Sequence, residues 1–160
     1  MVLLFSISVL HGQDAFEQLT TEECTIEYPT TWELNQSGQM GMSFILLSPL
    51  KLQGDQFREN VNLVIQDLSG YDMDLTDFIN LSENQIKSMI TEATFLTSER
   101  KGDFHEISYT GTMGIYKLQF FQRCWLIDRK AYILTFTAEQ EQYDNYHAIA
   151  QQIFASFKVK

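Results

Sequence analysis

Apolar and polar residues alternate along much of this chain, which is the pattern of β-strands that bury one side of a sheet. Gly or charged residues separate the later strands, as at Gly111, Gly114 and residues 128–130. Consecutive strands joined by such turns predict an antiparallel sheet. The predicted strands are residues 24–28, 42–47, 61–67, 95–99, 105–113, 115–127 and 131–137.

One predicted strand is apolar on both sides. Along residues 115–127, Leu118 and Phe120 point to one side, whereas Phe121 and Trp125 point to the other. This pattern is typical of a central strand in a sheet that is covered on both faces.

Two segments have helical periodicity instead. Residues 75–93 place their apolar side chains on one stripe. Near the end of the chain, Thr137 and Gln140 have the spacing of a capping box, which predicts that the last helix begins there. The stripe residues are Leu75, Phe78, Ile79, Ile86, Met89, Ile90 and Ala93 in the first helix, and Tyr143, Tyr146, Ala150, Ile153 and Phe157 in the second.

The resulting fold class is α+β, with an antiparallel β-sheet and helices packed on both faces in an α/β/α sandwich. No repeat or linker divides the chain, so residues 13–160 are predicted to form a single domain. Residues 1–12 are interpreted as a signal peptide or an N-terminal extension. Residues 2–10 are an apolar run of signal-peptide length, although no Lys or Arg precedes them, and the run is too short to span a bilayer. A periplasmic or secreted location is favoured, with a cytoplasmic one as the alternative.

The formal net charge of −10 argues against nucleic acid as a partner, because a polyanion would be repelled. The sequence contains no phosphate loop and no zinc or Cys-x-x-Cys pattern, so no cofactor is predicted. His105 and His147 accompany no nucleophile motif. A catalytic role is therefore not expected.

The two cysteines are predicted to be buried small apolar side chains. Cys24 alternates in phase with Ile26, and Cys124 alternates in phase with Phe120. An oxidising compartment would also permit a disulfide between Cys24 and Cys124, provided that they are adjacent in space.

Asp72, Asp74 and Glu83 are weak candidates for a metal site, because they fit positions of a calcium-binding loop. Asp77 stands where that loop requires a Gly. The simpler interpretation is that Asp74 caps the helix that begins at Leu75.

The polar segment 50–60 is predicted to be an exposed loop. Phe57 lies in it among charged residues, so burial gives little reason for its presence. Phe57, Arg58 and Trp32 are the candidates for a partner-binding surface. Packing in the core is the alternative for Trp32.

Several short motifs together resemble the PsbP-like family over residues 25–158. They are YPTTW at residues 28–32, SP at 48–49, ENVNLVIQDL at 59–68, GYDMDLTDF at 70–78, GIYKLQFFQRCWLIDRKAYILTFTA at 114–138 and SF at 156–157.

This resemblance implies an antiparallel sheet with helices on both faces and a role in binding. Members include extrinsic subunits of the photosynthetic oxygen-evolving complex, a Ran-binding relative, bacterial secretion adaptors and envelope proteins. The metal-binding histidines of the plant members have no motif-matched counterpart among His11, His105 and His147. The leading hypothesis is a non-catalytic binding or accessory module of the bacterial envelope with a protein partner. A cytoplasmic secretion-associated adaptor or chaperone, and a small enzyme whose site the sequence does not reveal, are the alternatives.

Overall fold

The computed structural model describes residues 15–51 and 54–160, so the predicted boundary after residue 12 lies outside the described residues. Strands dominate, and a 3-10 turn, η1, precedes the fourth of them. The elements in chain order are β1 Phe16–Thr20, β2 Cys24–Pro29, β3 Glu33–Asn35, η1 Gln39–Gly41, β4 Met42–Leu47, β5 Asn60–Asp67, α1 Leu75–Met89, β6 Thr91–Lys101, β7 Phe104–Met113, β8 Tyr116–Ile127, β9 Lys130–Glu139, α2 Tyr143–Ser156 and β10 Lys158–Val159.

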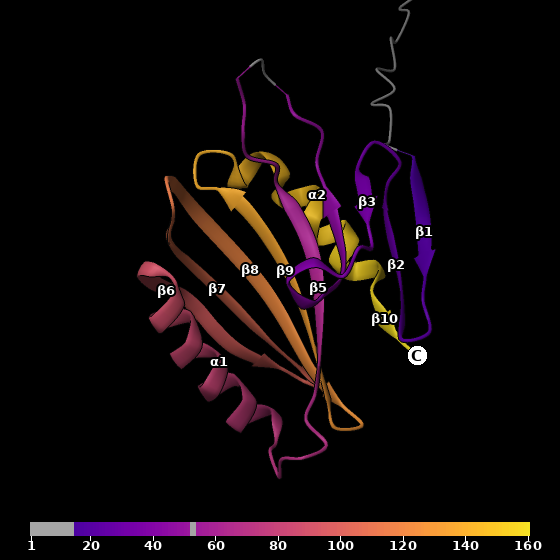
Figure 1. Ribbon diagram of the computed structural model, residues 1–160, viewed down its shortest axis with the longest axis vertical. Helices are drawn as coiled ribbons and strands as arrows, with labels where there is room; N and C mark the ends of the chain where they lie inside the picture. The colour runs from indigo at the N-terminus through magenta and orange to yellow at the C-terminus, as the bar shows by residue number, and fades with distance from the viewer. Residues whose placement is uncertain (1–14, 52–53) are drawn as a thin grey trace, which may run out of the picture.

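The strands of the described residues form two sheets, in which every pair is antiparallel. The larger sheet has the order β3-β4-β5-β9-β8-β7-β6, and the smaller has the order β1-β2-β10. After β5 the chain passes through α1 to the far edge at β6, and the meander β6 to β9 then returns to β5 (Figure 1). The predicted antiparallel sheet is confirmed.

Two hydrophobic clusters hold these layers together. The first contains buried residues of α2 and β2 together with Tyr132, Leu134 and Phe136 of β9. The second contains the buried residues of α1 together with Leu118 and Phe120 of β8. Figure 1 shows α2 lying between the larger sheet and β2, while α1 lies beside β6 and β7. Because successive strand residues point to opposite sides, β8 and β9 contribute to both clusters.

The first helix is shorter than its periodicity predicts. It ends at Met89, and Ile90 is already extended, so that Ala93 belongs to β6. Met89 was expected in the buried stripe but is 78% exposed. Pairing of β6 with β7 explains the early end, because the backbone from Thr91 onward bonds to a neighbouring strand rather than to the helix.

The predicted capping box of the last helix is wrong. Thr137 lies in β9, where it pairs with Asn60 and Phe120, and α2 begins at Tyr143. Gln142 is the N-cap and makes no side-chain cap bond. Cross-strand pairing on both sides of β9 extends the strand past the residue that local spacing favours as a cap.

Replacing Gly111 with alanine is expected to lower the free energy of unfolding by about 1–3 kcal/mol. A Cβ atom on Gly111 would lie 2.2 Å from Cγ2 of Ile90 and 3.1 Å from the backbone oxygen of Thr91. The edge strand β6 and the end of α1 would have to move away from β7. Urea unfolding followed by circular dichroism measures the change.

Gly70→Ala is the matched control, since a Cβ atom there would meet nothing within 4 Å. We expect it to change the stability by less than about 0.5 kcal/mol. Equal stability of the two variants would contradict the close approach of β6 to β7.

Candidate functional site: an uncharged groove on the larger sheet

The groove exists because α1 is too narrow to cover its side of the sheet. A helix is about 10 Å wide and strands are spaced about 4.8 Å apart, so one helix covers only two or three strands. Helix α1 contacts β6, β7 and β8. Beyond it, a groove of about 770 Å³ extends over β8, β9, β5 and β4. This volume is within the range of ligand-binding pockets.

The floor of the groove is uncharged and carries polar side chains among apolar ones such as Val64 and Ile133. Asn60, Asn62 and Gln66 on β5 line it, and they alternate with residues buried on the other side of that strand. Thr135 of β9 and Gln122 of β8 lie on the same row as Asn62. Nε2 of Gln122 donates a hydrogen bond of 3.2 Å to Oγ1 of Thr135. The floor therefore offers amide and hydroxyl groups at fixed positions.

Methionines surround this floor. Met40, Met42, Met89 and Met113 line the groove, which accounts for four of the six methionines in the sequence. Met40 is 88% exposed, although it is a large apolar residue. Because the thioether side chain is flexible and polarizable, methionine-rich surfaces adapt to apolar partners.

A β-bulge brings Met42 to the groove. The register between β4 and β5 shifts between Met42 and Phe44, so that Met42 pairs with Val64 and Phe44 pairs with Leu63. Without this shift, Met42 would point to the same side as Phe44, which is fully buried in the first cluster.

Phe57 joins the groove through an aromatic contact. Its ring centroid lies 5.1 Å from that of Tyr116, and both residues line the groove. Phe57 is partly buried and packs against the second hydrophobic cluster. Its role in partner binding stays a prediction.

Arg58 and Trp32 have structural positions instead. Arg58 donates from Nε to the Ser48 carbonyl at 2.6 Å and from Nη1 to Glu33 at 2.6 Å, which fastens the base of the loop. Trp32 is 6% exposed and packs edge-on against Tyr146 at 6.2 Å between ring centroids. Trp32 is therefore a core residue and does not lie at a partner surface with Phe57, since the chain turns after Pro29 toward α2.

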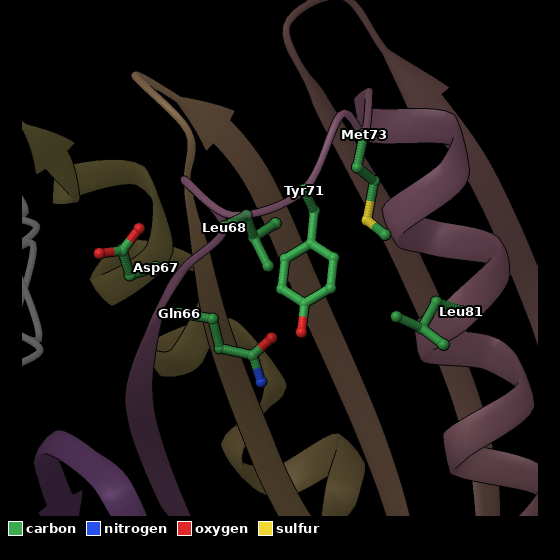
Figure 2. A pocket seen from close by; sticks show the side chains of 6 residues that line it. All are labelled: Gln66, Asp67, Leu68, Tyr71, Met73 and Leu81. Atoms are coloured by element: carbon green, nitrogen blue, oxygen red, sulfur yellow. The ribbon is translucent and has the colours of Figure 1, made fainter.

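A second cavity, of about 460 Å³, lies where β5 leads into α1. Figure 2 shows the Tyr71 ring projecting into the space between Gln66 of β5 and Leu81 of α1, while Asp67 points away from it. Tyr71 is 63% exposed. Since Gln66 lines both cavities, the second one adjoins the groove at this residue.

The calcium-loop candidates do not converge. Asp74 is the N-cap of α1 and accepts a 2.9 Å bond from the backbone N–H of Asp77, which confirms the capping interpretation. Glu83 accepts a hydrogen bond from Ser98 in β6. Over residues 15–51 and 54–160, no group of three or more His, Cys, Asp or Glu side chains is arranged to hold a metal ion. Helix formation from Leu75 onward separates Asp72 and Asp74 from Glu83.

His105 contacts Ser98, but the hydrogen bonds among Glu83, Ser98 and His105 run in a direction that does not activate the serine. Oγ of Ser98 lies 2.5 Å from Oε1 of Glu83 and 2.8 Å from Nε2 of His105. The hydroxyl proton goes to Glu83, so His105 donates to Ser98. A nucleophilic serine needs the opposite, with the histidine between serine and carboxylate. Partial burial lowers the pKa of His105, and the Glu83 carboxylate opposes this effect.

His147 stacks on Tyr143, with 5.3 Å between the ring centroids, and forms a hydrogen bond with Gln151.

Both cysteines are buried, as their alternation predicts, and both are free. Cys24 lies in the cluster with α2, and Cys124 lies in the cluster with α1. The disulfide considered between Cys24 and Cys124 is absent, because the two side chains belong to different cores. Burial raises the pKa of the Cys124 thiol to about 12.

Comparison with known proteins gives a likeness only at the level of structure. No family model and no curated protein matches the chain. The solution structure of cyanobacterial PsbP (CyanoP) from Synechocystis sp. PCC 6803 superposes with a TM-score of 0.66 at 15% identity, over 98% of this chain and 99% of that chain. The chain has a PsbP-like fold.

Two further structures share the PsbP-like fold of this chain. LpqN of Mycobacterium tuberculosis, described as involved in cell envelope biogenesis, has a TM-score of 0.68 at 8% identity over 92% of this chain and 91% of that chain. PA94 of Pseudomonas aeruginosa, described as a protein of unknown function and putative regulator, has a TM-score of 0.59 at 14% identity over 87% and 93%. At these identities the likeness establishes the PsbP-like fold alone. In the described part of the chain, no helix is both long and apolar enough to cross a membrane.

One feature of the sequence indicates the groove, although the assignment of strands from periodicity did not depend on it. From Asn60 to Gln66 the outward positions of β5 carry amides and a valine, whereas a solvent-facing strand usually carries charged residues. The methionines gave no such signal, because they come from three separate segments, with only Met40 and Met42 close in sequence.

Proposed function

We propose that this protein is a non-catalytic accessory module of the cell envelope that binds a protein partner through the groove. The observation that carries this proposal is the lining of the groove, which combines methionines, aromatic rings and side-chain amides and includes no charged residue. Burial raises the pKa of the Tyr109 phenol in the lining still further above neutral pH. The groove thus provides contact surface and hydrogen bonds rather than an acid, a base or a nucleophile.

The scaffold supports this role. In our interpretation, helices cover both faces of the larger sheet, as in an α/β/α sandwich, since Leu134 packs with α2 and Ala131 packs with the α1 cluster. Such a sheet holds the groove floor rigid, which lowers the entropic cost of binding. The description of LpqN as involved in cell envelope biogenesis supports placing the module in the periplasm or outside the cell.

Phe57→Ala is expected to weaken binding of a neutral apolar dye, N-phenylnaphthylamine, by about tenfold, because about 1.4 kcal/mol of aromatic contact with the ligand is lost. Fluorescence titration of the purified protein measures this change. Capture of partners from the native host, with the wild type and the variant in parallel, tests whether the same residue serves the protein partner.

Leu96→Ala is the matched control, since Leu96 is an apolar residue that is 52% exposed on β6 and does not line the groove. It should bind like the wild type. Saturable dye binding that Phe57→Ala leaves unchanged would contradict the proposal, as would failure of the wild type to bind.

A secretion-associated adaptor that shields an apolar client segment is the second candidate, because the same exposed groove suits it. The envelope accessory module and the adaptor differ in the cellular compartment in which the protein acts. N-terminal sequencing of the protein from its native host separates them: loss of residues 1–12 supports export, and their retention supports the adaptor.

A further inference from the structure

Carboxylates lie beyond one end of the uncharged groove. Glu139 is the last residue of β9 and continues the row of Ile133, Thr135 and Thr137, which line the groove. It pairs with Leu118, which also lines the groove. Glu139 therefore lies just beyond the end of the groove nearest Tyr116, where it lines an adjoining cavity, whereas the lining of the groove itself is uncharged.

Other carboxylates reinforce this acidic end. Burial raises the pKa of Glu139, and the negative charges of Glu59, Asp55 and Glu141 raise it further. Asp55 lies in the loop before β5, and Glu141 lies in the turn before α2. Glu59 directly precedes β5, and its carboxylate accepts a hydrogen bond of 3.3 Å from Ser48. Carboxylates from three segments thus act on Glu139.

The neighbouring cations do not neutralise this end. Arg58 is held by Glu33 and by two backbone carbonyls. Lys51 lies over the Tyr146 ring at 4.1 Å, on the side of α2. Lys117 lines the adjoining cavity together with Glu139. Lys117 carries one positive charge, whereas four carboxylates act at this end, those of Glu139, Glu59, Asp55 and Glu141. The whole chain has a net charge of −10.

The amides on the floor match the polar groups of a peptide. Each side-chain amide has two N–H donors and an oxygen that accepts two bonds. Asn62 donates to Asn60 at 3.3 Å, and Asn60 donates to the Arg58 carbonyl at 3.1 Å. These two hydrogen bonds use only some of the N–H donors and oxygen acceptors of the floor amides. The methionine rim provides adaptable contacts for apolar side chains of a peptide.

We propose that the groove binds an apolar peptide segment of a partner protein, with a Lys or Arg of that segment seated beside Glu139. This inference rests on the proposed function and adds the chemistry of the partner. Charge complementarity selects this occupant over an acidic peptide, because an anion would enter against the field of the acidic end.

Selection from a library of displayed random peptides on the full-length protein tests the proposal. Peptides that bind the wild type but not the Met40→Glu/Met89→Glu variant depend on the groove. We expect these peptides to share an apolar run with a Lys or Arg at one end. Groove-dependent peptides without a basic residue, or with acidic ones, would overturn the inference and leave the proposed function intact. Dye binding without any groove-dependent peptide would also overturn it, in favour of a small apolar ligand.

The selected basic peptide then tests the role of Glu139. Glu139→Gln is expected to weaken its binding about threefold to tenfold, and the difference should vanish at about 1 M salt, where the Debye length is about 3 Å. Glu27→Gln removes the same charge from an exposed position on β2 of the smaller sheet, which does not line the groove, and is expected to have no effect. Equal weakening by both variants would mean that only the net charge of the protein matters, which would overturn the placement of the basic residue.

Discussion

The double variant Met40→Glu/Met89→Glu is expected to lower the affinity of the groove for N-phenylnaphthylamine by about 100-fold or more. The two methionines lie in different elements that border the groove, at η1 and at the end of α1. A carboxylate at each position would have to lose water when an apolar ligand binds, which costs about 1–3 kcal/mol for each group even when partly compensated. Fluorescence titration measures the loss.

The fold should tolerate this change, because Met40 is 88% exposed and Met89 is 78% exposed. We therefore expect the midpoint of thermal unfolding to stay within about 2 °C of the wild type. Leu50→Glu/Leu96→Glu is the matched control: these residues are 54% and 52% exposed and do not line the groove. Equal loss of dye binding in both double variants would show that the dye binds elsewhere.

Phe136→Ala is expected to lower the free energy of unfolding by about 3–5 kcal/mol. Phe136 has no exposed surface, and its ring lies 5.3 Å from that of Tyr143 at the start of α2. It pairs with Val61 on one side and Phe121 on the other. Truncation leaves a cavity between β9 and α2 that close packing on both sides keeps from collapsing.

Urea unfolding measures this loss. Domains of this size have total stabilities of about 5–15 kcal/mol, so the alanine variant can approach the limit of folding. Phe136→Leu keeps most of the volume and is expected to lose about 1–2 kcal/mol. A loss in the leucine variant as large as that in the alanine variant would contradict the cavity explanation.

The sequence predicted what depends on neighbours along the chain. Alternation located the strands from β4 to β9 within a few residues, and it predicted that Cys24 and Cys124 are buried. Asp74 was identified as a cap because an N-cap bond joins residues three positions apart. These features are local, so a periodicity of two or of 3.6 residues is enough to reveal them.

Prediction failed where a partner strand overrides a local preference. Thr137 has the spacing of a helix cap but stays in β9, because β5 and β8 pair with it on both sides. Ile90 and Ala93 continue a helical stripe but leave the helix, because Thr91 already pairs with β7. The edge strands β1 and β10 were not predicted, since the two-residue β10 exists only through its pairing with β2.

The sequence by itself determined a PsbP-like sheet with buried apolar layers. Each layer consists of apolar residues that repeat at regular spacing along single strands or helices, and such a repeat is visible in the sequence. It also singled out Phe57, whose charged neighbours gave no reason for burial. Only the tertiary structure decided that Phe57 contacts Tyr116, that Trp32 is a core residue, and that four methionines from three segments surround one uncharged groove. The physical reason is that the groove arises from the path of α1 to the far edge of the sheet, which leaves strands uncovered, and no local pattern encodes that path.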